Sequence, residues 1–157
     1  EKGVEVANQD KIDELKKLTI SQLKNGETVW FGCDVGQMLE RKSGIMDSSI
    51  YNYEEVLNTA FNLTKADRVN YGDSCLTHAM VFTGVNILEN GPNRWKVENS
   101  WGKENGKDGF FVMSDKWFDQ FMYQVVVNKK YLSEECLAAL EKTPIELEPW
   151  DPMGSLA

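Results

Sequence analysis

The chain has 157 residues, of which 41% are hydrophobic and 27% charged. This balance is usual for one globular domain and unlike a disordered chain. The net charge of −8 argues against binding to nucleic acid or anionic lipid, because both need clustered positive charge. No apolar run approaches the roughly 18 residues of a membrane span. Three cysteines do not suggest a secreted disulfide framework, so a cytoplasmic location is predicted.

The first half of the chain is predicted to contain helix, strand and helix in that order. Apolar residues recur at helical spacing over 8–24, which predicts an amphipathic helix packed on a core. Residues 28–33 predict a buried strand, and residues 53–61 a short helix. The rest of 37–73 shows no clear periodicity. The chain starts Glu1-Lys2-Gly3 without an initiator Met, so we expect it to be part of a longer polypeptide.

The second half is predicted to consist mainly of strands. Ser114 and Ser133 are each expected to cap a helix, and Pro144 must end the second one. The last twelve residues show neither helical nor strand periodicity and predict an extended tail. This order favours an α+β fold with an antiparallel sheet. The predicted strands cover 75–87, 94–98, 110–113 and 123–127.

The only histidine, His78, lies in the first long strand of this half. A lone His in an apolar strand is often a structural residue. Its position alone does not distinguish a structural role from a catalytic one. Asn99 follows the next strand, 21 residues later, and adjacent antiparallel strands can bring the two side chains together. An Asn carbonyl that accepts the ring N–H would fix the tautomer of the imidazole. Trp101 could shield that hydrogen bond from water.

Several motifs in the same order resemble the papain-like cysteine peptidases. The segment Asn99-Ser100-Trp101-Gly102 is similar to the Asn-Ser-Trp-Gly segment of that family, and Thr77-His78-Ala79-Met80 to the strand with its active-site His. The closer resemblance is to the branch of bleomycin hydrolase and bacterial aminopeptidase C. It extends from about Leu15 to the ending Trp150-Asp151-Pro152-Met153-Gly154.

This resemblance implies a role for each matching residue. His78 would be the general base and acid, Asn99 the amide that orients it, and Trp101 the indole that shields the pair. Ala157 would lie at a C-terminus that turns back into the cleft, where its carboxylate holds the α-ammonium of a peptide substrate. The resemblance also implies an intracellular aminopeptidase that assembles as a hexamer. No cofactor is predicted, and one His without a Cys-x-x-Cys motif offers no plausible zinc ligand set.

The chain departs from the family pattern because none of its cysteines is followed by Trp. Cys33 and Cys136 are expected to be packing residues. Cys75 lies three positions before His78, so its side chain is expected on the opposite face of the strand. The nucleophile-bearing helical half is therefore predicted to be absent from this chain, which alone would be inactive.

The predicted organisation is the C-terminal, β-rich part of a papain-like peptidase. Its partners would be peptides with a free N-terminus and the missing N-terminal part of the same protein. A catalytically dead binding or scaffold module with the same fold is the alternative, and an activity of this chain based on Cys75 is a third. Four segments are expected, namely a lead-in over 1–74, the His- and Asn-bearing sheet over 75–131, a helix over 132–144 and a tail over 145–157.

Overall fold

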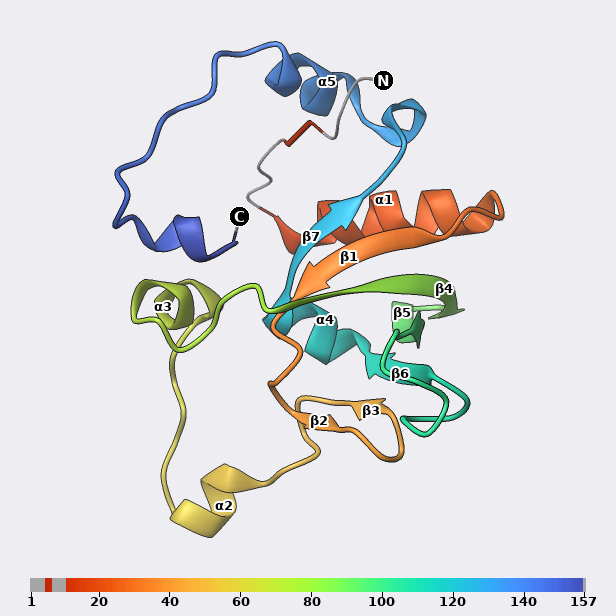
Figure 1. Ribbon diagram of the computed structural model, residues 1–157, viewed down its shortest axis with the longest axis vertical. Helices are drawn as coiled ribbons and strands as arrows, with labels where there is room; N and C mark the ends of the chain where they lie inside the picture. The colour runs from red at the N-terminus through yellow and green to blue at the C-terminus, as the bar shows by residue number, and fades with distance from the viewer. Residues whose placement is uncertain (1–4, 7–10, 157) are drawn as a thin grey trace.

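A computed structural model describes residues 5–6 and 11–156. Within that part of the chain a seven-stranded sheet has the order β2-β3-β6-β5-β4-β1-β7 (Figure 1). Its strands are β1 (Val29–Cys33), β2 (Leu39–Glu40), β3 (Ile45–Met46), β4 (His78–Leu88), β5 (Gly91–Glu98), β6 (Phe110–Ser114) and β7 (Met122–Val126). The α-helices are α1 (Ile12–Lys24), α2 (Tyr53–Leu57), α3 (Lys65–Asn70), α4 (Asp115–Phe121) and α5 (Glu134–Leu140). Two 3₁₀ turns, η1 (Lys129–Tyr131) and η2 (Pro152–Leu156), complete the described elements.

The predicted α+β class is confirmed, with one exception to the antiparallel sheet. Neighbouring strands pair antiparallel throughout, except that β3 pairs parallel with β6, with Ile45 opposite Val112. The exception arises from a two-strand hairpin, β2–β3, inside the segment whose sequence shows no clear periodicity. Each of these strands has two residues, which is too short for alternation to be recognised.

The expected helix starts of the second half are confirmed in detail. The Ser114 hydroxyl accepts a hydrogen bond from the Trp117 N–H at the start of α4. The Ser133 hydroxyl accepts one from the Cys136 N–H at the start of α5. Both follow the usual chemistry of an N-cap, in which a side-chain oxygen satisfies an otherwise free amide.

Two local predictions were wrong, and one short helix was missed. Strand β4 begins at His78, so Cys75 lies before the strand and not within it. The short helix α3 was not predicted, because only Val69 on it is buried and its main signal is a capping box between Thr64 and Asp67. The tail is extended only up to residue 148, then turns at 149–150 and forms η2.

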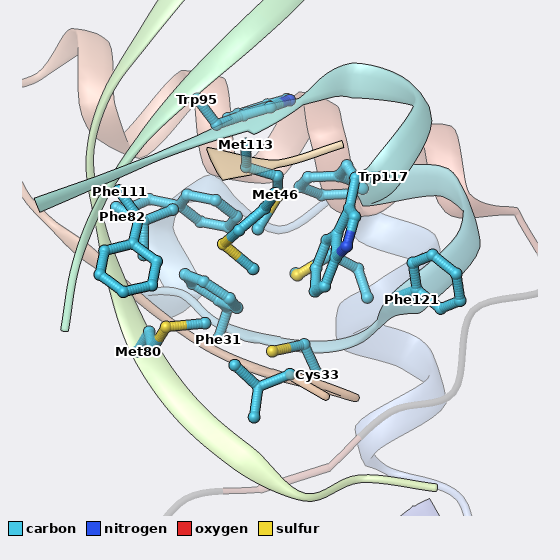
Figure 2. Packing of buried hydrophobic residues seen from close by; sticks show 14 of the residues in the cluster. Phe31, Cys33, Met46, Met80, Phe82, Trp95, Phe111, Met113, Trp117 and Phe121 are labelled. Carbon is cyan, nitrogen blue, oxygen red and sulfur yellow. The ribbon is translucent and has the colours of Figure 1, made fainter. Parts of the chain in front are cut away.

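The core lies on one face of the sheet and is rich in aromatic side chains (Figure 2). Phe31 and Phe82 face each other across β1 and β4 with ring centroids 3.9 Å apart. The Trp95 ring stacks on Phe118 of α4 at 4.8 Å, and its indole N–H donates to Asp115 at 3.0 Å. The contacts of Trp95 join α4 to the middle of the sheet.

Helix α1 packs against β1, β4 and β7, and Figure 1 shows it running alongside β1. Its buried Lys16 pairs with Asp115 at 2.7 Å and Asp119 at 2.6 Å, both on α4. A buried cation of this kind needs such partners, because desolvation of an unpaired charge is costly. The pairing explains why a lysine is tolerated on the face of α1 that was predicted to be apolar.

Replacing Phe82 by alanine should lower the free energy of unfolding by about 3–5 kcal/mol, the usual cost of removing a fully buried Phe. Phe82 is 0% exposed and contacts three other aromatic rings, so its neighbours cannot close the cavity. Denaturant unfolding measures the change. Phe61→Ala is the matched control, since this side chain is 59% exposed, and a loss as large as for Phe82 would contradict the assignment of the core.

Candidate active site

His78 is the first residue of β4 and lies opposite Cys33 of β1. Its Nε2 is 3.0 Å from Asn99 Oδ1, so the structure brings together the two residues that the sequence paired. Asn99 Oδ1 also accepts the Ser100 N–H at 2.8 Å. The backbone N–H of Ser100 can only donate, so the Asn99 side-chain atom that it contacts must be the carbonyl oxygen. The same oxygen faces His78 Nε2, and Nε2 must therefore carry the proton. The other ring nitrogen, Nδ1, forms no hydrogen bond within the described residues and is available for proton transfer.

Asn99 directly follows β5 and is held by its backbone as well as its side chain. Its N–H donates to the Gly109 carbonyl at 3.0 Å, which ties the end of β5 to the start of β6. The side chain is buried, and its Nδ2 has no hydrogen-bond partner among the described residues. A buried amide donor without a partner is costly and calls for an explanation. Here the orientation is imposed by the carbonyl end, which accepts two donors.

Trp101, the third residue of the predicted site, lies against the His78 ring. Its ring stacks on the imidazole at 4.9 Å with 29° between the planes. The backbone carbonyl of Trp101 accepts the side-chain N–H of buried Asn105 at 2.7 Å. An apolar cover of this kind keeps water from competing for the hydrogen bond beneath it.

Arg41 is part of this arrangement and was missed by sequence reasoning. Its guanidinium lies 4.6 Å from the centre of the Trp101 ring, and its Nε donates to Asn105 Oδ1 at 2.5 Å. The residue lies in the turn between β2 and β3, inside the segment without periodicity, so no signal in the sequence marked it. Cation–π and charge-assisted hydrogen bonds together fix the indole from the side of the hairpin.

A buried polar cluster supports the residues that lead into His78. Ser74 donates to the Asp34 carboxylate at 2.8 Å and lies 2.7 Å from the Tyr123 hydroxyl. The Thr77 hydroxyl accepts the Val35 N–H at 3.0 Å. Since Asp34 and Val35 directly follow β1, these bonds fix 74–77 against the end of that strand. The cluster thereby fixes the backbone position of His78.

Lys65 of α3 lies over the ring of Tyr123, and its ammonium donates to the Met122 carbonyl. Burial lowers the pKa of Lys65 from 10.5 to about 8. The folded state therefore releases this proton at a lower pH than the unfolded state does. The resulting destabilisation is fully present below about pH 8 and is relieved as the pH rises to about 10.5.

Replacing Lys65 by methionine should consequently raise the free energy of unfolding near neutral pH, by at most about 3 kcal/mol. The gain should shrink as the pH rises from 8 towards 10.5, where wild-type Lys65 becomes neutral in both states. Urea unfolding at several pH values tests this. Lys116→Met is a control on an exposed lysine of α4. A gain for Lys65→Met that does not vary with pH would contradict the burial argument.

The tail returns to the neighbourhood of His78, and Figure 1 shows it curling back towards α3. Leu76 lies two residues before His78, and its N–H donates to the Ser155 carbonyl at 2.9 Å. The side-chain amide of Gln124 donates to the Leu156 carbonyl. Ala157, the predicted clamp for the substrate N-terminus, lies outside the described residues.

The three cysteines are free. Cys33 is buried, and burial together with nearby Asp34 raises the pKa of its thiol far above the ordinary value. Its Sγ is 3.7 Å from the backbone carbonyl of His78. Cys136 is buried in α5, and Cys75 forms no hydrogen bond with His78 within the described part of the chain. None of the three therefore combines an accessible, readily ionised thiol with a bond to the imidazole.

Among the residues that the structure describes, no group of three or more His, Cys, Asp or Glu side chains could hold a metal ion. In the same residues no helix has both the length and the apolar character needed to cross a bilayer.

Comparison with known proteins decides the family. The model of the Peptidase C1-like family matches residues 2–154. The chain belongs to this family. It is 59% identical over 146 residues to aminopeptidase C of Listeria innocua, covering 93% of this chain and 33% of the relative. It is 47% identical over 154 residues to bleomycin hydrolase of Mus musculus, covering 96% of this chain and 34% of the relative.

A solved structure agrees with this assignment. The crystal structure of PepW from Lactobacillus rhamnosis HN001 superposes with a TM-score of 0.88 at 54% identity, covering 93% of this chain and 33% of that one. The papain-like fold class is thus confirmed. The chain spans about one third of the length of the relatives that it matches.

Proposed function

We propose that this chain is the His- and Asn-bearing part of a cysteine aminopeptidase. The observation that carries the proposal is the 3.0 Å contact between His78 Nε2 and Asn99 Oδ1 beneath the Trp101 ring. The names of the relatives, aminopeptidase C and bleomycin hydrolase, support the same reaction. Substrates would be peptides with a free N-terminus.

In this proposal the nucleophile is a cysteine of the polypeptide outside these 157 residues. His78 Nδ1 takes the proton of that thiol, and the resulting imidazolium stabilises the thiolate. The thiolate attacks the peptide carbonyl, and the imidazolium returns the proton to the leaving amine as the acyl-enzyme forms. Water then hydrolyses the thioester, with His78 as its general base. Throughout, Asn99 holds Nε2–H and so keeps Nδ1 in the required tautomer.

The tail and the assembly are further parts of the proposal. The tail over 145–157 would end in the cleft, so that the carboxylate of Ala157 holds the substrate α-ammonium and blocks binding beyond it. The segments 1–74, 75–131 and 132–144 would be the lead-in, the catalytic sheet and a peripheral helix of this part. We also propose a cytoplasmic location and a hexameric assembly.

Experiments on the complete protein distinguish this proposal from the alternative, a catalytically dead binding or scaffold module. The reading frame of the complete protein should encode a Cys-Trp pair after a Gln-rich loop upstream of Glu1. The complete protein should release N-terminal residues from peptides, and the 157-residue chain alone should not. A thiol-alkylating reagent should abolish the activity, and a metal chelator should not. Another residue at the cysteine position, or an activity that resists alkylation, would refute the peptidase proposal.

A further inference from the structure

We propose that Gln124 is a specificity-determining residue, because it holds the tail beside the strand that carries His78. This inference rests on the proposed aminopeptidase function. Two donors from different elements bind consecutive carbonyls of the tail. The Leu76 N–H binds the Ser155 carbonyl at 2.9 Å, and the Gln124 side-chain amide binds the Leu156 carbonyl. Together they fix both the position and the direction of the chain just before residue 157.

The strand register places this attachment close to the candidate catalytic residue. Gly32 of β1 lies opposite Ala79 on one side and opposite Gln124 on the other. These three residues therefore form a row across β4, β1 and β7. Strands lie about 4.8 Å apart, so the backbone of Gln124 is about 10 Å from that of Ala79, the immediate neighbour of His78. The tail is therefore attached two strands away from the residue that follows His78.

Gly32 in the middle of the row makes room for both anchors. A Cβ at this position would lie 2.7 Å from Leu76 Cδ1 and 3.4 Å from Gln124 Oε1. The Leu76 side chain thus lies over Gly32, beside the Gln124 amide. Any side chain at this position would displace Leu76 and crowd Gln124, and so would loosen the tail without touching the tail itself.

The tail forms few other hydrogen bonds to the rest of the protein, so the bond from Gln124 contributes a large share of its attachment. Within the described residues, the other hydrogen bonds of 151–156 stay inside the tail, for example from the Gly154 N–H to the Asp151 carbonyl at 2.9 Å. Trp150 is 78% exposed and Met153 45% exposed, so apolar burial holds this segment weakly. Losing one of two anchoring hydrogen bonds should therefore increase the detached fraction several-fold.

The test uses the complete protein and one peptide in two forms, with a free or an acetylated N-terminus. With Gln124→Ala, hydrolysis of the acetylated form should rise about threefold to tenfold, the population change that one neutral hydrogen bond produces. KM for the free form should change far less than this, because the attached form remains the major one, and kcat should stay the same. Gly32→Ala should act in the same direction. Gln37→Ala is the matched control, because its side-chain amide binds the Asp73 carbonyl at 3.3 Å, away from the tail, and should change neither value.

Deleting Leu156 and Ala157 separates this inference from the function on which it rests. If the deletion raises hydrolysis of the acetylated peptide and Gln124→Ala adds nothing in that background, Gln124 acts through the tail as proposed. If the deletion has this effect but Gln124→Ala and Gly32→Ala equal wild type in the intact protein, the role of Gln124 is refuted and the tail function stands. If the deletion itself changes nothing, the tail function fails, and the role of Gln124 fails with it.

Discussion

Replacing His78 by alanine in the complete protein should lower kcat by about 10³-fold or more, since the change removes the residue that we propose as both general base and general acid. The fold should persist, because the ring is only partly buried and core residues of β4 such as Phe82 are unchanged. Steady-state hydrolysis of a peptide with a free N-terminus measures the loss, and a thermal unfolding curve checks the fold.

A control on the same strand distinguishes chemistry from stability. Thr83→Ala alters β4 five residues beyond His78, where the Thr83 hydroxyl has no hydrogen-bond partner within the described residues. This variant should retain wild-type kcat. If His78→Ala retained activity, or if Thr83→Ala lost as much kcat while both variants stayed folded, the catalytic assignment of His78 would be contradicted.

Deleting Leu156 and Ala157 should change the type of cleavage. An α-ammonium bound to a carboxylate forms charge-assisted hydrogen bonds worth about 1.5–3 kcal/mol, so KM for peptides with a free N-terminus should rise by about 10- to 150-fold. Acetylated peptides, which the proposed tail function would exclude, should become substrates and be cut internally. Mass spectrometry of the products identifies the cut sites. A product pattern identical to that of wild type would rule out a tail that occupies the cleft.

The fold could be predicted from the sequence where elements are long and regular. The strand predicted over 28–33, the strand predicted over 94–98 (β5 starts three residues earlier) and the two Ser-capped helices were found, because alternation and capping are local signals. The hairpin β2–β3 and the helix α3 were not. Each is stabilised by contacts with distant residues, as Ile45 opposite Val112 illustrates, and a short element leaves no periodic pattern.

The candidate site divides in the same way. His78 and Asn99 could be paired from the sequence because one lies in a strand, the other directly follows the next strand, and both lie within recognisable motifs. Arg41 could not, since its role depends on a hairpin 60 residues before Trp101. In the sequence, Gln124 is only a polar residue on the exposed side of a strand. Its hydrogen bond to the tail appears only in the structure. Only the tertiary structure reveals such contacts.

The most direct test of the central claim is the alkylation rate of the complete protein with iodoacetamide near pH ~6, with the labelled residue identified by mass spectrometry. An unassisted thiol with a pKa of about 8.5 is less than about 1% ionised there. A thiolate paired with the His78 imidazolium is largely ionised. The account predicts rapid labelling of one cysteine outside these 157 residues, slowed about 100-fold by His78→Ala. Labelling at Cys33, Cys75 or Cys136, or a rate that His78→Ala leaves unchanged, would contradict it.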